Sequence, residues 1–299
     1  MLAHGSIEAA RRHRPPRQWP PRLGRFLFLC TTAAVPLAVG LWAAGIGSGA
    51  GVFCLLGLWF ALAHLGSFYA PSGIFGPTLL HGPGIRRQVA LTFDDGPDPA
   101  TTPKVLEVLG RHGVRATFFV IGERAARHPE VIAAIAQAGH QIESHSHRHS
   151  WWTAFTPRSR LTAELHEAQA AITKACGRSP RWLRPPIGIL SPEIVAAAQQ
   201  VGLRLCAWSC KARDGLAGTS VESALSRLRR GLHPGAILLL HDAAEAPARP
   251  AAAAPAASAL RDRPAPIAPA VLEQLLPELA AHNLSAVTLD ELLEPAARR

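Results

Sequence analysis

The feature that most restricts how this chain folds is a long uncharged stretch, residues 26–85, which contains no aspartate, glutamate, lysine or arginine. A helix needs about 20 apolar residues to cross a bilayer, so the stretch suits two membrane helices better than one. We predict a transmembrane hairpin over residues 26–70, with helices near 26–46 and 52–70. A secretory signal peptide is the alternative, but its apolar region usually spans only ~7–15 residues.

The arginines that flank this hairpin indicate its orientation. Six arginines precede it in a basic tail, residues 1–25, and Arg86 and Arg87 follow it, whereas the turn inside it has none. Positive flanks favour the cytoplasmic side, so we predict a multi-pass protein of the inner membrane with its main domain on the cytoplasmic face. A single span followed by an interfacial helix is the alternative, and it would export the domain.

The overall charge narrows the choice of partner. The formal net charge is +10, almost all of it from arginine. Nucleic acid is not an expected partner, because basic and aromatic residues do not interleave and no zinc-knuckle spacing occurs. Membrane lipid with an anionic surface fits better. The five cysteines show no framework spacing, and the odd number indicates reduced thiols.

After the hairpin, the sequence alternates short β-rich runs with helical runs, which is typical of an α/β barrel or a parallel sheet. A glycine- and proline-rich linker, residues 71–87, leads into a domain at 88–294. Strands are expected at 89–93, 116–121, 141–144, 182–184, 203–208, 236–240 and 285–289. Helices are expected at 102–111, 130–138, 157–176, 192–201, 221–231 and 271–281. Residues 243–270, rich in proline and alanine, are expected to form a flexible loop.

Two adjacent acids follow the first of these strands. Asp94 and Asp95 come directly after a β-rich run, and Gly96-Pro97 ends the run. Two carboxylates at such close range cannot both stay ionised unaided, and a metal ion would allow it. Side chains able to join them also lie just past predicted strands, where the chemistry of parallel barrels gathers: His145, Arg184, Asp214 and His241.

The histidines suggest the other ligands of that ion. His145 and His149 are four residues apart, so they can lie on one side of a helical turn and converge on one metal. A solvated histidine-rich loop is the alternative. His147 should point elsewhere, and His140 should be a surface residue at a strand end. The pair Trp151-Trp152 that follows can stack on a sugar ring or pack beneath the loop.

The ordered motifs resemble those of one family. Thr92 to Gly96 reads Thr-Phe-Asp-Asp-Gly, and together with the histidine pair and the later motifs it is similar to the polysaccharide deacetylase family, the NodB-homology domain of metal-dependent carbohydrate esterases. The resemblance runs from about residue 88 to residue 293. It implies an α/β fold, a distorted, incomplete (β/α)7-type barrel, here preceded by the two transmembrane helices.

The resemblance also implies roles for the site residues. Asp94 would be the general base, and Asp95 would bind a divalent metal with His145 and His149. Two imidazoles and one carboxylate leave coordination positions open, which is typical of a catalytic metal. Zinc is the first choice for this ligand set, and Co²⁺, Ni²⁺ or Fe²⁺ also suit it. The cation would lower the pKa of bound water and polarise the acyl oxygen.

Three further residues match family positions. Arg184 stands in an Arg-x-Pro-x-Gly motif and would keep Asp94 ionised and oriented. His241 matches the histidine that protonates the leaving amine, and Asp214 matches its acidic partner. The sequence departs from the family at three positions, which puts substrate identity in doubt: Ile187 for an aromatic residue, Lys211 for an aspartate and Gly215 for a tryptophan.

The sequence thus predicts a membrane-anchored, divalent-metal-dependent hydrolase that removes N-acetyl or other N-acyl groups from amino sugars. The substrate would be an envelope polysaccharide or a lipid-linked saccharide. Two alternatives remain open at this point. One is a deformylase or deacylase of another small amide, and the other is a catalytically inactive membrane protein that binds carbohydrate or acts as a scaffold.

Overall fold

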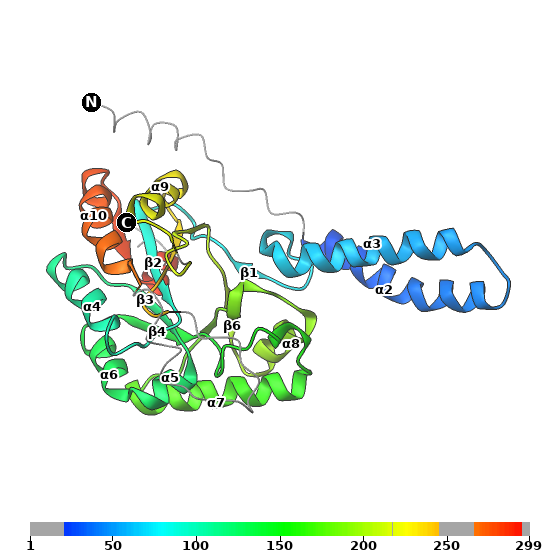
Figure 1. The fold of residues 1–299 in the computed structure, drawn as a ribbon, viewed down its shortest axis with the longest axis horizontal. Helices are drawn as coiled ribbons and strands as arrows, with labels where there is room; N and C mark the ends of the chain where they lie inside the picture. Colours follow the sequence, from blue (N-terminus) through cyan, green and yellow to red (C-terminus); the bar gives the residue numbers. More distant parts are fainter. Residues whose placement is uncertain (1–20, 217, 245–265, 295–299) are drawn as a thin grey trace.

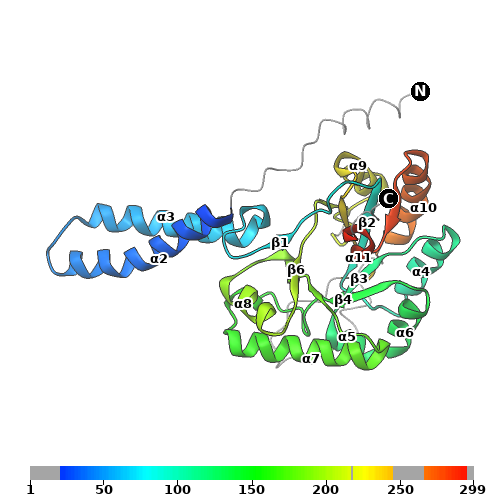
Figure 2. The ribbon, with the colours of Figure 1, turned by 180° about the vertical axis from the view of Figure 1, so that it is seen from behind.

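The computed structural model describes residues 21–216, 218–244 and 266–294, and it has two parts: a pair of long helices and an α/β domain (Figure 1). Residues 1–20 of the basic tail and residues 245–265 of the proline- and alanine-rich segment lie outside the described residues. The hairpin projects from the side of the domain that carries β1, β6 and α8 (Figures 1 and 2). The hairpin therefore lies on one side of the domain, as a distinct part of the structure.

The helix pair consists of α2 (Pro21–Ala43) and α3 (Gly49–Phe68), which lie side by side and antiparallel. Both are long and apolar enough to cross a membrane, judged by length and composition. Their outer surfaces expose large apolar side chains, and between them Trp59 Nε1 donates a hydrogen bond to Thr32 Oγ1 at 2.9 Å. The helices begin a few residues earlier than the sequence suggested.

The domain is built on one sheet whose paired strands all run parallel. The strand order is β1-β6-β5-β4-β3-β2-β8-β7, and β9 also pairs with β2. The strands are β1 (Thr78–Leu79), β2 (Gln88–Asp94), β3 (Thr117–Val120), β4 (Gln141–Ser144), β5 (Trp182–Leu183), β6 (Arg204–Cys206), β7 (Cys210–Lys211), β8 (Ile237–His241) and β9 (Ser285–Val287). This arrangement confirms the incomplete parallel barrel.

Helices cover the outside of the sheet. They are α4 (Thr102–Arg111), α5 (Gly122–Arg127), α6 (Pro129–Gln137), α7 (Arg158–Cys176), α8 (Pro192–Gln200), α9 (Val221–Gly231), α10 (Ala268–Ala281) and α11 (Leu289–Leu293). The sequence predicted the longer ones within a few residues, because their apolar residues repeat at helical spacing and pack on the sheet. It missed α5, α11, β1 and β7, which are too short to show a period.

Two large clusters hold the domain together. One lies between the sheet and helices α4, α9 and α10, and buries one face of β2, β3 and β8, with Leu91, Phe118 and Leu238 fully covered. The other joins the domain to α3, since Leu62 of α3 belongs to the same buried cluster as Leu183 and Ile194. β1 belongs to the segment expected to be a linker, yet it pairs with β6. That segment is therefore part of the sheet.

Candidate active site

The two adjacent acids at the end of β2 have different backbone conformations. Asp94 is the last residue of the strand and lies beside His241 of β8 in the parallel register. Asp95 follows with a positive φ of 74°, a conformation that aspartate tolerates better than most residues, and the Gly96–Pro97 peptide bond is cis. Both side chains are almost completely buried. The turn therefore presents two carboxylates at the carboxyl edge of the sheet.

Asp95, His145 and His149 converge at this edge. Asp95 Oδ1 lies 3.4 Å from His145 Nε2 and 3.3 Å from His149 Nε2. One ligand atom from each of the three residues lies within 4.8 Å of the others. All three side chains are buried. The residues that the sequence assigned to a metal are thus within common reach of one ion.

The hydrogen bonding of this cluster leaves room for a bound cation. His145 Nδ1 donates to the carbonyl oxygen of Arg184 at 2.7 Å, so Nε2 is the nitrogen that faces the cluster. Asp95 Oδ1 is buried and has no hydrogen-bond partner. A buried, unpartnered carboxylate oxygen between two imidazole nitrogens is costly unless a cation satisfies it. Two nitrogens and one oxygen are a donor set that suits zinc and its neighbours.

Charge coupling within the cluster shifts its pKa values. Burial opposes the charge of Asp95, but the neighbouring imidazole of His145 outweighs it and holds the pKa of Asp95 below its usual range. Burial likewise opposes the protonation of His145, but Asp94 and Asp95 raise its pKa. Burial and the nearby His145 lower the pKa of His149 to about 4. His149 is therefore neutral near pH 7, as a metal ligand must be.

A buried ion pair holds the second acid. Arg184 Nη1 donates to Asp94 Oδ1 at 2.6 Å and also to Thr92 Oγ1 at 2.9 Å. Its Nη2 donates to the carbonyl oxygen of Ala207 at 2.8 Å, and the guanidinium lies over the Phe119 ring at 4.0 Å. Arg184 is fully buried. Asp94 therefore has one oxygen fixed, while its Oδ2 points toward His145 at 3.9 Å.

His241 and Asp214 form a second fixed pair. His241 Nδ1 donates to Asp214 Oδ1 at 2.8 Å, and the backbone N–H of His241 donates to Asp214 Oδ2 at 2.9 Å. Burial acts against protonation, but the hydrogen bond and charge of Asp214 outweigh it and raise the pKa of His241 to about 9. His241 therefore carries a proton at neutral pH, and its Nε2 is the nitrogen that Asp214 leaves unbound.

The structure corrects two predictions about the histidines and confirms a third. His145 and His149 do not lie on a helical turn, because Ser146 and His149 have φ values of 66° and 50°. Their convergence comes from a loop in which His149 N–H donates to Ser146 Oγ at 3.0 Å. His140 is buried, not on the surface, and its Nδ1 accepts a hydrogen bond from the Ala116 N–H at 3.1 Å. His147 does point elsewhere, toward Glu167 of α7 at 3.6 Å.

The residues that depart from the family line the rim of the site. Ile187 has a φ of 58°, which strains a β-branched residue, and its side chain is exposed. Trp208 packs on Gly188, where an added Cβ would lie 2.4 Å from the ring. Lys211 Nζ lies 5.6 Å from the same ring, and a Cβ on Gly215 would lie 3.3 Å from the His241 ring.

The sequence interpretation assigned no role to Asp242 and Arg124, although both support the site. Asp242 is fully buried; its Oδ2 accepts from Thr102 Oγ1 at 2.5 Å, and its carboxyl packs so closely on Gly96 that an added Cβ would lie 2.3 Å away. Arg124 Nη1 donates to the Asp95 carbonyl oxygen at 2.8 Å. The only feature of the sequence that pointed to a role for Asp242 was its place directly after His241. No feature of the sequence pointed to Arg124.

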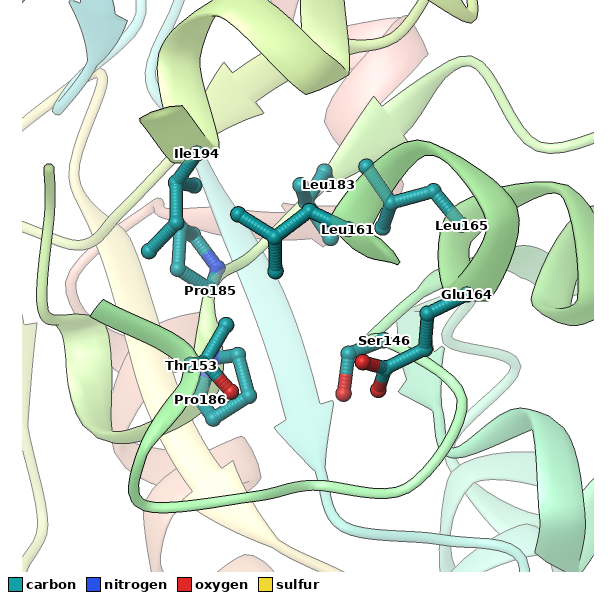
Figure 3. A pocket seen from close by; sticks show the side chains of 9 residues that line it. All are labelled: Ser146, Thr153, Leu161, Glu164, Leu165, Leu183, Pro185, Pro186 and Ile194. Carbon is teal, nitrogen blue, oxygen red and sulfur yellow. The ribbon is translucent and has the colours of Figure 1, made fainter. Parts of the chain in front are cut away.

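A small apolar pocket lies behind the histidine loop (Figure 3). Ser146 and Glu164 stand on one side of it, and Thr153 and Pro186 on the other. Its volume is only about 10 Å³, roughly that of one water. It is a packing gap beneath the loop and has no room for an acyl chain.

Comparisons with known proteins agree with this geometry. Residues 81–206 match the polysaccharide deacetylase family model, a range that contains the three clustered residues and Arg184 but ends before Asp214. A chitooligosaccharide deacetylase from Bradyrhizobium sp. is 41% identical over 161 residues, 52% of this chain and 71% of its own length. A peptidoglycan-N-acetylglucosamine deacetylase from Bacillus cereus is 32% identical over 160 residues, 54% of this chain and 58% of its own length.

Solved structures share the fold. A family 4 acetyl xylan esterase from Clostridium thermocellum, in complex with a cobalt ion, has a TM-score of 0.57 at 29% identity and covers 69% of this chain and 89% of its own. A family 4 pseudoenzyme from Bacillus anthracis has a TM-score of 0.62 at 22% identity and covers 73% of this chain and 69% of its own. At that identity the pseudoenzyme shows the fold alone.

The parallel half-barrel, with acids and histidines gathered at the carboxyl ends of its strands, is that of an α/β-barrel hydrolase. The chain belongs to the polysaccharide deacetylase family, and its deacetylase relatives identify it as a hydrolase that acts on N-acetyl amide bonds. The family match covers the same residues whose side chains the structure brings together. Together, the match and the geometry establish the class of enzyme.

Proposed function

We propose that this protein is a membrane-anchored, divalent-metal-dependent deacetylase of amino sugars in an envelope polysaccharide or a lipid-linked saccharide. The observation that carries the proposal is the buried cluster of Asp95, His145 and His149 beside two fixed acid–base groups. Deacetylases of chitooligosaccharide and of peptidoglycan among the relatives support an N-acetylated amino sugar as the substrate. The acyl group is then acetyl.

The cluster would hold the metal. Asp95 supplies one carboxylate oxygen, and His145 and His149 each supply Nε2. Zinc is the proposed ion, and Co²⁺, Ni²⁺ or Fe²⁺ suit the same donors. The cobalt in the acetyl xylan esterase supports a site of this kind. When bound, the cation would lower the pKa of a coordinated water and polarise the acyl oxygen.

Asp94 and His241 would move the protons. Asp94 has a free Oδ2, while Arg184 fixes Oδ1, so this carboxylate is oriented to take the proton of the attacking water. His241 holds a proton at neutral pH because Asp214 raises its pKa. It would give that proton to the leaving amine, and Asp214 would stabilise the charged imidazole before transfer. The backbone N–H of Ile187 would face the oxyanion.

The experiment that tests this proposal measures acetate release from a chitooligosaccharide by the full chain. Asp94→Asn should lower the rate by ~10²–10⁴-fold, the usual contribution of a general base. Chelation should abolish the activity, and added Zn²⁺ should restore it. His147→Ala is the control, since His147 points away from the cluster. Acetate release that survives both Asp94→Asn and chelation would refute the proposal.

The same experiment separates the two alternatives. An inactive carbohydrate-binding protein would release no acetate yet would bind the saccharide with or without chelation. A deacylase of a small amide would hydrolyse a formyl or simple acetyl amide faster than the saccharide. Comparison of the rates on these substrates therefore distinguishes the three functions.

Membrane anchoring is part of the proposal. It is supported by the length and apolar surface of α2 and α3 and by their antiparallel packing. The arginines around them favour a hairpin with the domain on the cytoplasmic face of the inner membrane. A reporter fused after Arg299 tests this: a cytoplasmic reporter should be active, and a periplasmic one should not. The opposite result would mean a single span and an exported domain.

A further inference from the structure

The loop that follows the histidine pair exposes three large aromatic side chains. It includes the 3-10 turn η3 (Thr153–Phe155), and the exposed fractions are 49% for Trp151, 72% for Trp152 and 81% for Phe155. The rings of Trp152 and Phe155 lie 6.2 Å apart. Exposed aromatic side chains grouped in this way usually mark a surface that contacts something else. We call residues 151–155 the aromatic loop.

The aromatic loop is connected to the hairpin through buried packing. Thr153 is buried and lines the small pocket of Figure 3 together with Leu161 and Ile194. Leu161 and Ile194 also belong to the apolar cluster that includes Leu62 of α3. The path from the loop to the hairpin is therefore continuous packing through α7 and α8.

A hydrogen bond also connects the segment that follows Arg184 to the same hairpin. The Leu190 N–H donates to the carbonyl oxygen of Ser67 in α3 at 3.1 Å. Leu190 is buried and comes just after the Arg-Pro-Pro-Ile-Gly segment that begins at Arg184. The active site and α3 therefore keep one fixed relative orientation.

The composition of the aromatic loop and of the helix after it matches that of a membrane interface. Tryptophan is enriched at the level of lipid headgroups, because its ring is apolar and its N–H is polar. The exposed residues Arg158 and Arg160 follow at the start of α7; Arg158 Nε donates to Glu193 Oε2 at 3.0 Å, so Arg160 is the cation offered to an anionic surface. Arginine next to exposed aromatic rings favours an anionic lipid surface.

We propose that the aromatic loop contacts the surface of the same bilayer that α2 and α3 cross, so that the mouth of the active site faces lipid headgroups. The proposal rests on the membrane anchoring proposed above. It deepens the choice of substrate: an amino sugar carried on a membrane lipid, not a polymer remote from the bilayer.

The distance along the chain supports that choice. Trp151 follows His149 by two residues, and two residues span at most ~7 Å. A headgroup contact at the aromatic loop therefore brings the metal cluster close to the bilayer surface. A saccharide attached directly to a lipid can then reach the cluster without leaving the membrane.

The first experiment places a fluorescent label on the full chain in lipid nanodiscs that contain an anionic phospholipid and a nitroxide-labelled lipid. Labels are attached at Phe155→Cys, at Gln274→Cys and at the natural Cys54, each in a chain with the other exposed or half-exposed cysteines replaced by alanine. Gln274 is exposed on α10, on the side of the domain away from the hairpin (Figure 1). Cys206 and Cys210 are buried, and burial raises their pKa to about 11, so they do not react with the label.

We expect the nitroxide lipid to quench the label at residue 155 at least about threefold more than the label at residue 274. The label on Cys54 reports whether the hairpin is in the bilayer, so it tests the anchoring separately. Strong quenching at Cys54 with equal, weak quenching at residues 155 and 274 would overturn the proposal. Weak quenching at Cys54 would overturn the anchoring, and the lipid-facing site with it.

The second experiment compares two substrates in unlabelled nanodiscs: a soluble chitooligosaccharide and a chitooligosaccharide of the same length carried on diacylglycerol. Phe155→Ser should lower the rate on the lipid-borne saccharide several-fold and leave the rate on the soluble one unchanged. An equal loss on both would mean that the loop stacks on sugar, and no loss on either would mean that it touches neither. Both results overturn the proposal. Failure of the deacetylase function would instead abolish both rates in the wild-type chain.

Discussion

The two halves of the active site are built in opposite ways. In the metal half, Asp95, His145 and His149 point ligand atoms at one another, and the central oxygen has no hydrogen-bond partner. In the acid half, Asp214 engages His241 with both of its oxygens. The first arrangement is incomplete without a cation, whereas the second already holds its proton. The difference supports the proposal that the first half binds the metal and the second half donates a proton.

The match to the family model also differs between the two halves. The metal half lies within the residues that match the family model, and the acid half lies beyond them. Two departures from the family lie on this side of the site: Gly215 lies against the His241 ring, and Lys211 lies near the Trp208 ring. The proposed metal ligands thus lie within the part of the chain that matches the family, while the surroundings of the proposed proton donor differ from the family pattern.

The largest effect should come from the metal half. His145→Ala removes one ligand and the hydrogen bond to the Arg184 carbonyl oxygen, so the protein should lose both its bound metal and its activity. Metal content by elemental analysis and acetate release are the two measurements. His147→Ala should keep both. A His145→Ala protein with full metal content would mean that the ligands lie elsewhere.

The acid half should respond with a shift in pH dependence. Asp214 raises the pKa of His241 to about 9, so the donor is protonated below that pH and loses its proton as the pH rises through it. In Asp214→Asn the alkaline limb of the kcat profile should move down toward pH ~6.5, and kcat near neutrality should fall ~10²-fold. Metal content should not change. An unmoved alkaline limb would show that His241 is not the acid.

Asp242, which lies next to both halves, should affect stability more than chemistry. Burial and the charge of Asp95 raise its pKa to about 7, so the folded protein binds this proton more tightly than the unfolded chain does. Asp242 therefore lowers the free energy of unfolding as the pH rises from about 4 to about 7. Asp242→Asn should remove that decline, and its thermal midpoint should exceed that of the wild type by several degrees at pH 8. Equal midpoints at pH 5 and pH 8 in the wild type would contradict this.

The smallest effect should come from the rim of the acid half. Lys211 is exposed and touches the site only through its position near the Trp208 ring. Lys211→Ala should leave kcat unchanged and should change KM for a chitooligosaccharide by about threefold or less, as expected for an exposed cation–π contact. A large loss of kcat would place Lys211 within the chemistry.

Much of the fold was readable before the structure was known, for local reasons. The apolar runs of β2 and β8 and the periodic helices α4 and α9 depend on residues close together in sequence. The short elements β1 and β7 were not readable, because two residues form a strand only when a neighbouring strand offers partners. The pair Asp94 and Asp95 was found from adjacency alone, but the αL turn that directs Asp95 was not.

The sequence by itself determined the chemistry that is available: which residues can bind a metal, which can carry a proton, and which helices can enter a membrane. Only the tertiary structure decided how they meet. Parallel pairing brought Asp94 beside His241, a strained loop turned His149 back toward His145, and packing on α3 fixed the domain against its hairpin. These contacts join residues far apart in the chain, so no local pattern encodes their distances.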